Sequence, residues 1–129
     1  MEKIQKITKE KYPAQLLEIP HIPEKLFIRG TLPEDGSRFL CVVGSRKYTE
    51  YGKEACKKIV SELRGHDIVI VSGLALGIDS IAHRAALEAG LTTVAFPGSG
   101  LDSTVLYPAG NYNLAEQILK HGGALVSEF

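Results

Sequence analysis

The sequence has few of the features that mark secreted and membrane proteins. It contains two cysteines, Cys41 and Cys56, among 129 residues, too few for the disulfide framework of a small secreted domain. Its longest uninterrupted apolar run, residues 39–43, is far shorter than the roughly 20 residues that span a membrane. The first residues also lack the apolar segment of a signal peptide. These absences predict a cytoplasmic protein whose two cysteines are small core side chains.

An excess of charge of one sign is also absent. The 15 basic and 15 acidic residues cancel to a net charge of zero, which excludes a uniformly basic coat for nucleic acid. The distribution is nevertheless uneven. Residues 46–64 contain six Lys or Arg against three acids, whereas residues 65–129 contain two against six. The sequence is therefore compatible with a local basic patch at residues 46–64. An anion would have to bind at a specific site formed by particular residues.

Strand and helix patterns alternate from residue 38 onward. The predicted strands are residues 38–44, 67–72, 91–96 and 124–129, and the predicted helices are residues 49–66, 78–89 and 113–121. Such alternation with short connections is typical of right-handed βαβ units. The fold class is therefore α/β and doubly wound, with a mostly parallel sheet and helices on both faces. The first strand, residues 38–44, is apolar enough to be buried on both faces.

The remaining segments complete a single domain. Residues 1–37 read as an N-terminal extension packed on the core, with a short helical stretch at Leu16 and a strand at residues 26–29. Residues 38–129 form the core. Because the chain stops directly after a strand, we expect this core to be incomplete at its C-terminal end, as a naturally short protein or as a fragment.

Two helix starts show capping signals. Thr49 is expected to cap the helix that follows it. Asn113 and Glu116 have the spacing of a reciprocal capping pair at the start of the last helix.

Three glycine-bearing turns follow the first three strands of the core, at residues 44–46, 72–77 and 97–100. In a sheet of this class, ligands bind beyond the carboxyl ends of the strands. Glycine lets backbone N–H groups approach a ligand closely, and the first two turns lead into helix N-termini, which favour anions. Ser45 adds a hydroxyl and Arg46 a bidentate guanidinium. One such turn alone is more often structural, but three at one edge predict a phosphate pocket.

Other polar residues support weaker interpretations. Asp79 and His83 are spaced like a metal pair, but two ligands are too few, and we favour a loop-binding Asp79 with His83 packed beside it. Asp102, Tyr107 and Asn111 lie in the long loop beside the pocket. Tyr107 offers either a stacking face or a loop anchor. The remaining histidines are expected in solvent: His21, His66 and His121.

The common catalytic and nucleotide motifs do not match. No GxxxxGK[ST] sequence occurs, and residues 98–103 end in Ser where the dinucleotide motif needs Gly. No Ser-His-Asp or Cys-His grouping and no paired carboxylates are suggested. We therefore predict no catalytic residue, no metal and no cofactor, and a protein that is not an enzyme.

An ordered set of motifs gives the chain a family resemblance. It includes Gly44-Ser45-Arg46, then Ser72-Gly73-Leu74-Ala75 with Gly77-Ile78-Asp79 and Ala82-His83, then Gly100-Leu101-Asp102, Tyr107-Pro108 and Asn111, and finally Ser127-Glu128-Phe129. In this set, and in nearly the whole chain from Tyr12-Pro13 onward, the sequence resembles the DNA-processing protein A family, also called DprA or Smf.

The resemblance implies a Rossmann-like domain that binds single-stranded DNA without turnover. In that family the protein acts in DNA recombination: it protects incoming strands during natural transformation (competence) and helps to load the RecA recombinase. Carried over, the expected DNA- or phosphate-binding residues are Gly44, Ser45, Arg46, Ser72, Gly73, Gly98, Gly100, Asp102, Tyr107 and Asn111. The expected partners are single-stranded DNA and a RecA-type recombinase, with no membrane.

The chain departs from the family pattern at its end. The family continues into a segment with an Arg-Asn-Arg motif and often into a small helical domain, so homodimerisation and RecA loading stay open for this chain. Two alternatives use the same phosphate pocket. One is a nucleoside-monophosphate phosphoribohydrolase-like enzyme, whose motif residues 97–100 begin to match but do not complete. The other is a nucleotide-sensing Rossmann domain.

Overall fold

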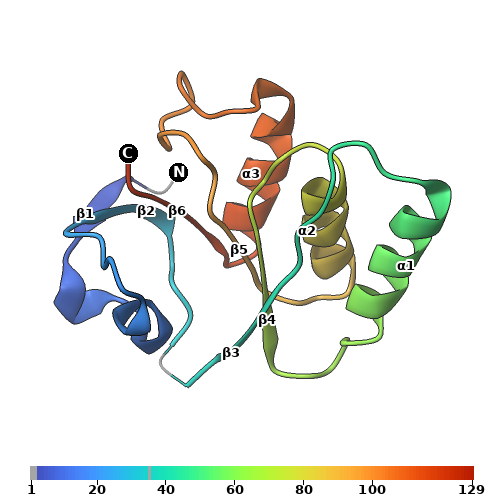
Figure 1. Ribbon diagram of the computed structural model, residues 1–129, viewed down its shortest axis with the longest axis horizontal. Helices are drawn as coiled ribbons and strands as arrows, with labels where there is room; N and C mark the ends of the chain where they lie inside the picture. The colour runs from blue at the N-terminus through green and yellow to red at the C-terminus, as the bar shows by residue number, and fades with distance from the viewer. Residues whose placement is uncertain (1–2, 35) are drawn as a thin grey trace.

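A single mixed sheet organises the molecule (Figure 1). The computed structural model describes residues 3–34 and 36–129. The strands are β1 Gln5–Ile7, β2 Leu26–Gly30, β3 Arg38–Cys41, β4 Ile68–Ser72, β5 Thr93–Ala95 and β6 Ala124–Ser127. The α-helices are α1 Glu50–Ser61, α2 Ile78–Glu88 and α3 Tyr112–Lys120, and the 3-10 helices are η1 Lys9–Lys11, η2 Ala14–Glu18 and η3 Ala109–Asn111.

The strand order is β1-β2-β6-β5-β4-β3. Strands β3, β4, β5 and β6 are parallel, whereas β1 and β2 are antiparallel to their neighbours. The predicted α/β class with a mostly parallel sheet is therefore confirmed. The N-terminal segment supplies two strands of this sheet, and β1 is one that the sequence pattern did not indicate.

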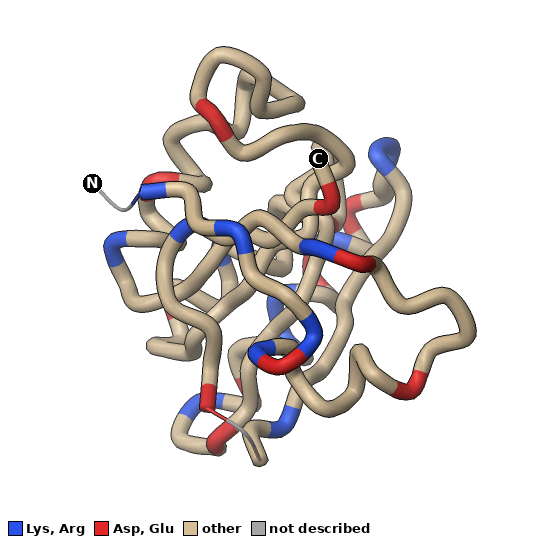
Figure 2. Tube along the Cα trace, turned by 90° about the vertical axis from the view of Figure 1, so that its left-hand side faces the viewer, with Lys and Arg blue, Asp and Glu red and all other residues tan. Residues whose placement is uncertain are grey.

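The N-terminal segment lies along one side of the sheet. The buried ring of Tyr12 packs with Ile7 and Ile28, and its hydroxyl donates to the carbonyl of Pro23 at 2.8 Å. Figure 2 looks at this side of the molecule and shows basic and acidic residues interspersed along the chain. Opposite charges at close spacing give this side no strong field of either sign.

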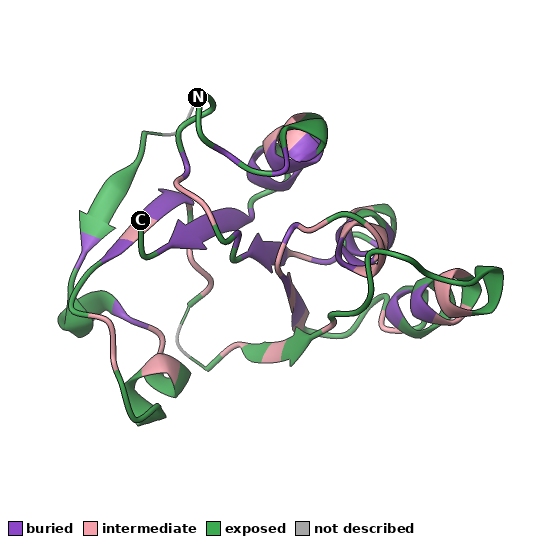
Figure 3. Cartoon of the chain, turned by 45° about the horizontal axis from the view of Figure 1, so that its top comes forward, coloured by how far each residue is buried: buried purple, intermediate pink, exposed green. Residues whose placement is uncertain are grey.

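The three α-helices all lie on the same face of the sheet. Each crossover from β3 to β6 steps to the next strand in the same direction, and right-handed crossovers that never reverse place every helix on one side. Accordingly α1 packs on α2, and α2 packs on α3 (Figure 3). The opposite face is covered by η1 and η2. The structure thus differs from the doubly wound expectation, because within the described residues the second face has short 3-10 helices in place of α-helices.

Small side chains let the helix layer approach the sheet closely. Ala82, Ala85 and Ala86 of α2 are buried against Val60 of α1 and Ile70 of β4. A second cluster joins α3 to the sheet through Leu114, Ile118 and Leu125, among others. The helix predicted at residues 78–89 is therefore confirmed as α2, and Ala82 and Ala85 lie on its buried face.

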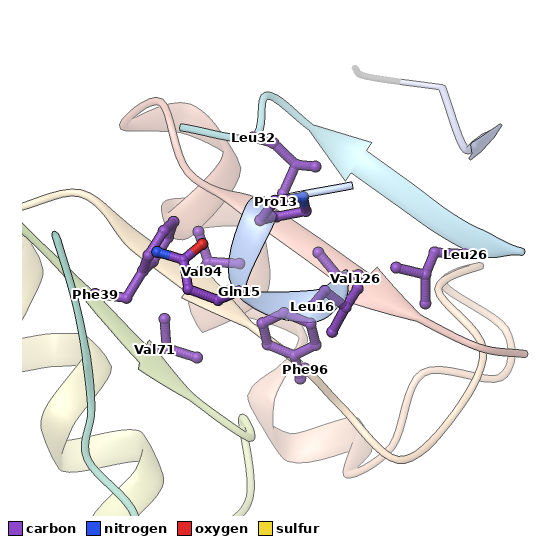
Figure 4. A pocket seen from close by; sticks show the side chains of 10 residues that line it. All are labelled: Pro13, Gln15, Leu16, Leu26, Leu32, Phe39, Val71, Val94, Phe96 and Val126. Carbon is purple, nitrogen blue, oxygen red and sulfur yellow. The ribbon is translucent and has the colours of Figure 1, made fainter. Parts of the chain in front are cut away.

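The opposite face is incompletely covered. Beside η2 lies an apolar pocket of about 180 Å³, which Figure 4 shows from close by. Leu16 of η2 lines one side, and Phe39, Val71 and Phe96 from the sheet line the other. This pocket contains none of the residues predicted to bind phosphate.

Strand β3 corrects two expectations. It is an edge strand that pairs with β4 alone among the described residues, and its Leu40 side chain is 38% exposed. The prediction that this segment is buried on both faces is therefore wrong, since an apolar run alone does not distinguish an edge strand from a central one. Cys41 is exposed for the same reason, whereas Cys56 is buried as expected. Burial raises the pKa of the Cys56 thiol.

The capping predictions had different outcomes. Thr49 caps α1 as expected, because its hydroxyl accepts a hydrogen bond from the Gly52 N–H at 3.0 Å. The predicted Asn113–Glu116 pair is wrong, because α3 begins at Tyr112 directly after η3. Glu116 instead lies 3.5 Å from the guanidinium of the buried Arg29.

Candidate nucleic-acid interface

The three predicted glycine turns meet at the carboxyl edge of the parallel strands. They border a pocket of about 170 Å³. Its lining residues are Arg46, Gly73, Ala75, Leu76, Gly98, Tyr107 and Pro108. Four of the predicted site residues, one from each of the three turns and one from the long loop, are thus brought together. Ala75, Leu76 and Pro108 were not among the predicted site residues, although Ala75 and Pro108 belong to the family motifs and Leu76 to the second glycine turn.

Asp79 joins two of these turns. The buried carboxylate accepts hydrogen bonds from the backbone N–H groups of Gly44 at 3.3 Å, Gly73 at 3.1 Å and Ala75 at 3.4 Å. The loop-binding interpretation of Asp79 is therefore confirmed. Because Gly44 follows β3 and Gly73 follows β4, this one side chain sets the distance between the first two turns.

Gly77 brings the same two turns into direct contact. Its φ is +88°, and a Cβ there would clash with the Ser45 carbonyl and lie 2.5 Å from Arg46 Cα. Only glycine allows this approach with a positive φ. The N–H of Ile78 donates to the Ser45 carbonyl at 3.1 Å. The first turn of α2 thus holds the backbone that carries Arg46.

Ser45 and Arg46 are both exposed, and Arg46 lines the pocket. The Ser45 hydroxyl accepts a hydrogen bond from the Lys47 N–H at 3.0 Å, which leaves its own proton for another acceptor. Beside them, Gly98 has open space next to its Cα. A guanidinium and accessible glycine backbone therefore line one opening, and the Ser45 hydroxyl belongs to the residue next to Arg46.

Asn111 supports the pocket from beneath. Its side chain is buried, and its amide donates to the Leu74 carbonyl at 2.7 Å and to the Ser80 hydroxyl at 2.8 Å. Ser80 in turn donates to the Ala75 carbonyl at 2.7 Å. Leu74 has a positive φ of 60°, so these bonds hold a strained turn. In this structure, Asn111 positions the loop at residues 73–77 and does not line the pocket.

Two hydrogen bonds at Ser99 hold the start of the loop at residues 98–111. The Tyr107 N–H donates to the Ser99 hydroxyl at 2.9 Å, and the Ser127 hydroxyl donates to the Ser99 carbonyl at 2.6 Å. The ring of Tyr107 is 59% exposed. The backbone of Tyr107 therefore anchors the loop, as one of the two interpretations predicted. Its ring is exposed as well, so the stacking role of this ring remains a prediction.

Gly100 and Asp102 lie in this loop but outside the pocket lining. The Asp102 carboxylate accepts from both the N–H and the hydroxyl of Thr104, at 2.9 and 2.7 Å. These hydrogen bonds hold the pKa of Asp102 below its usual range. A Cβ on Gly100 would touch the Val105 side chain. The structure therefore places both residues in the internal geometry of the loop.

Arg29 is a positioning residue that the sequence reasoning missed. It is buried in β2, and its guanidinium donates to the Leu101 carbonyl at 3.5 Å and lies beside Glu116. It therefore links the start of the long loop to α3. An arginine at the end of the apolar strand 26–29 was the signal available in the sequence.

Ser72 and His83 lie below the pocket in the interior. Both are buried, and neither the Ser72 hydroxyl nor His83 Nε2 has a hydrogen-bond partner among the described residues. His83 Nδ1 lies 2.7 Å from the Thr93 hydroxyl, which itself donates to the Ile70 carbonyl. Since that hydroxyl has one proton, Nδ1 must be the donor and Nε2 the bare nitrogen. His83 therefore packs in the core, as the sequence suggested. The exposed positions of His21, His66 and His121 are also confirmed.

The chemistry of the pocket is that of an anion site. Its lining contains one guanidinium and no carboxylate or imidazole. The part of the chain that the structure describes holds no group of three or more residues suited to a metal ion. Within that same part, no helix is long and apolar enough to cross a membrane.

Comparison with known proteins decides the family. The model of the family described as DNA recombination-mediator protein A matches residues 3–129. The chain belongs to this family. It is 42% identical to Protein Smf of Escherichia coli over 93% of its own length, and 43% identical to DNA processing protein DprA of Streptococcus pneumoniae over 83%. The resemblance drawn from the motifs is confirmed.

Solved structures of family members share the fold. DNA processing protein A from Streptococcus pneumoniae superposes on 98% of this chain with a TM-score of 0.82 at 35% identity. The protein from Helicobacter pylori, whose structure concerns its single-stranded DNA binding mode, superposes on the whole chain with a TM-score of 0.79 at 30% identity. This chain spans 32% and 37% of the two curated relatives named above. It therefore corresponds to about a third of each of these two relatives.

Proposed function

We propose that this chain binds single-stranded DNA by its phosphate backbone at the carboxyl-edge pocket. The observation that carries the proposal is the meeting of Arg46, Gly73, Gly98 and Tyr107 in one opening. A guanidinium holds a phosphate by two parallel hydrogen bonds, and glycine backbone lets the strand come close. The Ser45 hydroxyl beside Arg46 adds a donor for a phosphate oxygen.

The exposed ring of Tyr107 favours a single strand over a duplex. An aromatic face stacks on an unpaired base of any sequence, whereas bases within a duplex are already stacked. The expected binding is therefore tolerant of sequence. The Helicobacter pylori relative, with its single-stranded DNA binding mode, supports this choice of ligand.

The chain acts in this proposal by binding, without a chemical step. A hydrolase would need a general acid or base at the ligand, and the pocket lining offers neither a carboxylate nor an imidazole. This favours the DNA-binding proposal over the phosphoribohydrolase-like alternative.

The wider role follows from the family. As part of a recombination mediator, the chain would act in the cytoplasm on incoming single strands during natural transformation and help to load a RecA-type recombinase. Homodimerisation is part of the same proposal. These properties belong to a whole family member, of which this chain spans about a third.

The test is fluorescence anisotropy of a labelled oligo-dT titrated with the chain at several salt concentrations. Affinity should fall as salt rises, because phosphate contacts release counterions. Arg46→Ala should weaken binding for every sequence alike. Arg38→Ala is the matched control, since Arg38 is also exposed but lies at the opposite end of β3.

Binding that does not respond to salt, or that Arg46→Ala and Arg38→Ala reduce equally, would contradict the proposal. Thermal stabilisation by a mononucleotide without binding of oligo-dT would replace it with the nucleotide-sensing alternative.

A further inference from the structure

The outer groove between α1 and α2 holds a second group of basic side chains. Two adjoining hollows run along it, both lined by Lys57, Ala85 and Glu88. The two hollows together are here called the α1–α2 groove. Five cations line it: Lys53, Lys57, Lys58, Arg64 and Arg84. The carboxylates that share the groove are Glu54 and Glu88. Because α1 packs directly on α2, cations from two helices face the same hollow.

Among the described residues, none of these five cations has a carboxylate within ion-pair distance. Across residues 3–34 and 36–129, the side chains of Lys53, Lys57 and Arg84 take part in no ion pair. Arg64 donates to the backbone carbonyl of Glu88 at 3.3 Å, a bond that leaves its charge uncompensated by a carboxylate. Like charges gathered in one groove raise the local potential and attract an anion.

The two helices that form the groove start at the edge of the sheet where the pocket lies. Both helices start at the carboxyl edge, α1 a few residues after Arg46 and α2 directly after Gly77. The close contact of Gly77 with Arg46 holds the two starts together. Lys53 lies in the first turns of α1, and Lys57 follows one turn later, about 6 Å further along the axis. The cations are therefore spread along the lengths of α1 and α2, the two helices that Figure 1 shows beside each other.

We propose that the α1–α2 groove is a second contact surface for the phosphate backbone of the strand held in the pocket. This inference rests on the proposed function and adds a path for the strand beyond the pocket. The cations are spread over more than two helical turns, so a single phosphate cannot reach all of them. A polyanion with regularly spaced charges fits this distribution. Lysine is suited to such contacts because it acts as a mobile point charge.

The test compares two lengths of oligo-dT, about 6 and about 20 nucleotides, which bracket the ~4–16 nucleotides of typical single-strand sites. The variant Lys53→Gln/Lys57→Gln/Arg84→Gln removes three charges from the groove. The matched control Lys6→Gln/Lys9→Gln/Lys11→Gln removes three exposed charges from the N-terminal segment. A third variant, Lys53→Arg/Lys57→Arg/Arg84→Lys, keeps the charge of the groove. Circular dichroism checks that each variant is folded.

The groove variant should weaken binding of the longer strand alone. Its slope of log affinity against log salt should fall in magnitude by about 2, from three contacts at about 0.7 each. The control and the charge-keeping variant should both behave like the unaltered chain. Equal weakening for both lengths, or no difference from the control, would overturn the groove proposal.

Failure of the proposed function has a different signature. Absence of oligo-dT binding to the unaltered chain, or binding that survives Arg46→Ala at both lengths, would remove the pocket from the account. If Arg46→Ala abolishes binding but the groove variant does not change it, the pocket proposal stands and the groove proposal is wrong.

Discussion

Asp79 shows how one side chain assembles the pocket. Its carboxylate accepts N–H bonds from two turns that are far apart in the sequence, and it is 6% exposed. Backbone donors that lose such an acceptor in the interior cost about 1–3 kcal/mol each. The position of Asp79 near the start of the predicted helix at residues 78–89 suggested that it binds a neighbouring loop. The identity of the donors could not be predicted, because they depend on how β3 and β4 pair.

Asp79→Asn should therefore destabilise the fold by about 2 kcal/mol, because an amide cannot accept on both of its heteroatoms. Urea unfolding followed by circular dichroism measures the change. Asp67→Asn is the control, since Asp67 is exposed just before β4. Equal midpoints for the two variants would show that the Asp79 bonds contribute nothing to stability.

His83 makes the stability of the chain depend on pH. Burial lowers the pKa of His83 to about 4, although the Asp79 carboxylate and the Ser72 backbone favour the charged form. The unfolded chain takes up this proton at about pH 6.5. Stability should thus be complete above about pH 6.5 and should fall as pH drops towards 4, by about 3 kcal/mol in all.

The measurement is urea unfolding at a series of pH values, comparing His83→Gln with His66→Gln. His66 is exposed, so its variant should retain the slope between pH 4 and 6.5. His83→Gln should lose most of that slope, whatever its absolute stability. An unchanged slope in His83→Gln would assign the pH dependence to other groups.

At the scale of elements, the starts of α1 and α2 fix where Arg46 lies. Helix periodicity predicted both α1 and α2 from the sequence, and Thr49 predicted where α1 begins. Sequence periodicity did not reveal that Gly77 packs on the backbone of Ser45 and Arg46, because a glycine in a turn has several possible causes. The edge position of β3 was hidden for a related reason: strand order is a property of the whole sheet.

Gly77→Ala tests this contact. Both Gly77 and Gly90 have a positive φ, +88° and +74°, but a Cβ on Gly90 meets nothing within 4 Å. Gly90→Ala should cost about 1–2 kcal/mol from backbone strain alone and leave DNA binding unchanged. Gly77→Ala should cost more and also weaken oligo-dT binding, since Arg46 must shift. Urea unfolding and anisotropy measure the two effects. If Gly77→Ala loses stability but binds oligo-dT as well as the unaltered chain, the Gly77 contact does not position Arg46 for binding.

At the scale of the molecule, the order of the parallel strands places all the α-helices on one face of the sheet and leaves the other face to the N-terminal segment. All α-helices cover one face of the sheet, the pocket opens at its carboxyl edge, and the apolar pocket of Figure 4 lies on the opposite face. The βα alternation was enough to predict the class of fold and the edge of the sheet at which the glycine turns meet. The covering of the second face could not be predicted, since it depends on the order in which the strands are placed.

The most direct test of the central claim is an NMR titration of the ¹⁵N-labelled chain, which at 14.0 kDa is well suited to it. Oligo-dT should shift the amide signals of Arg46, Gly73, Ala75 and Gly98 most strongly, because these residues line the carboxyl-edge pocket. Shifts confined instead to the apolar pocket, at Leu16 and Phe39, would contradict the account.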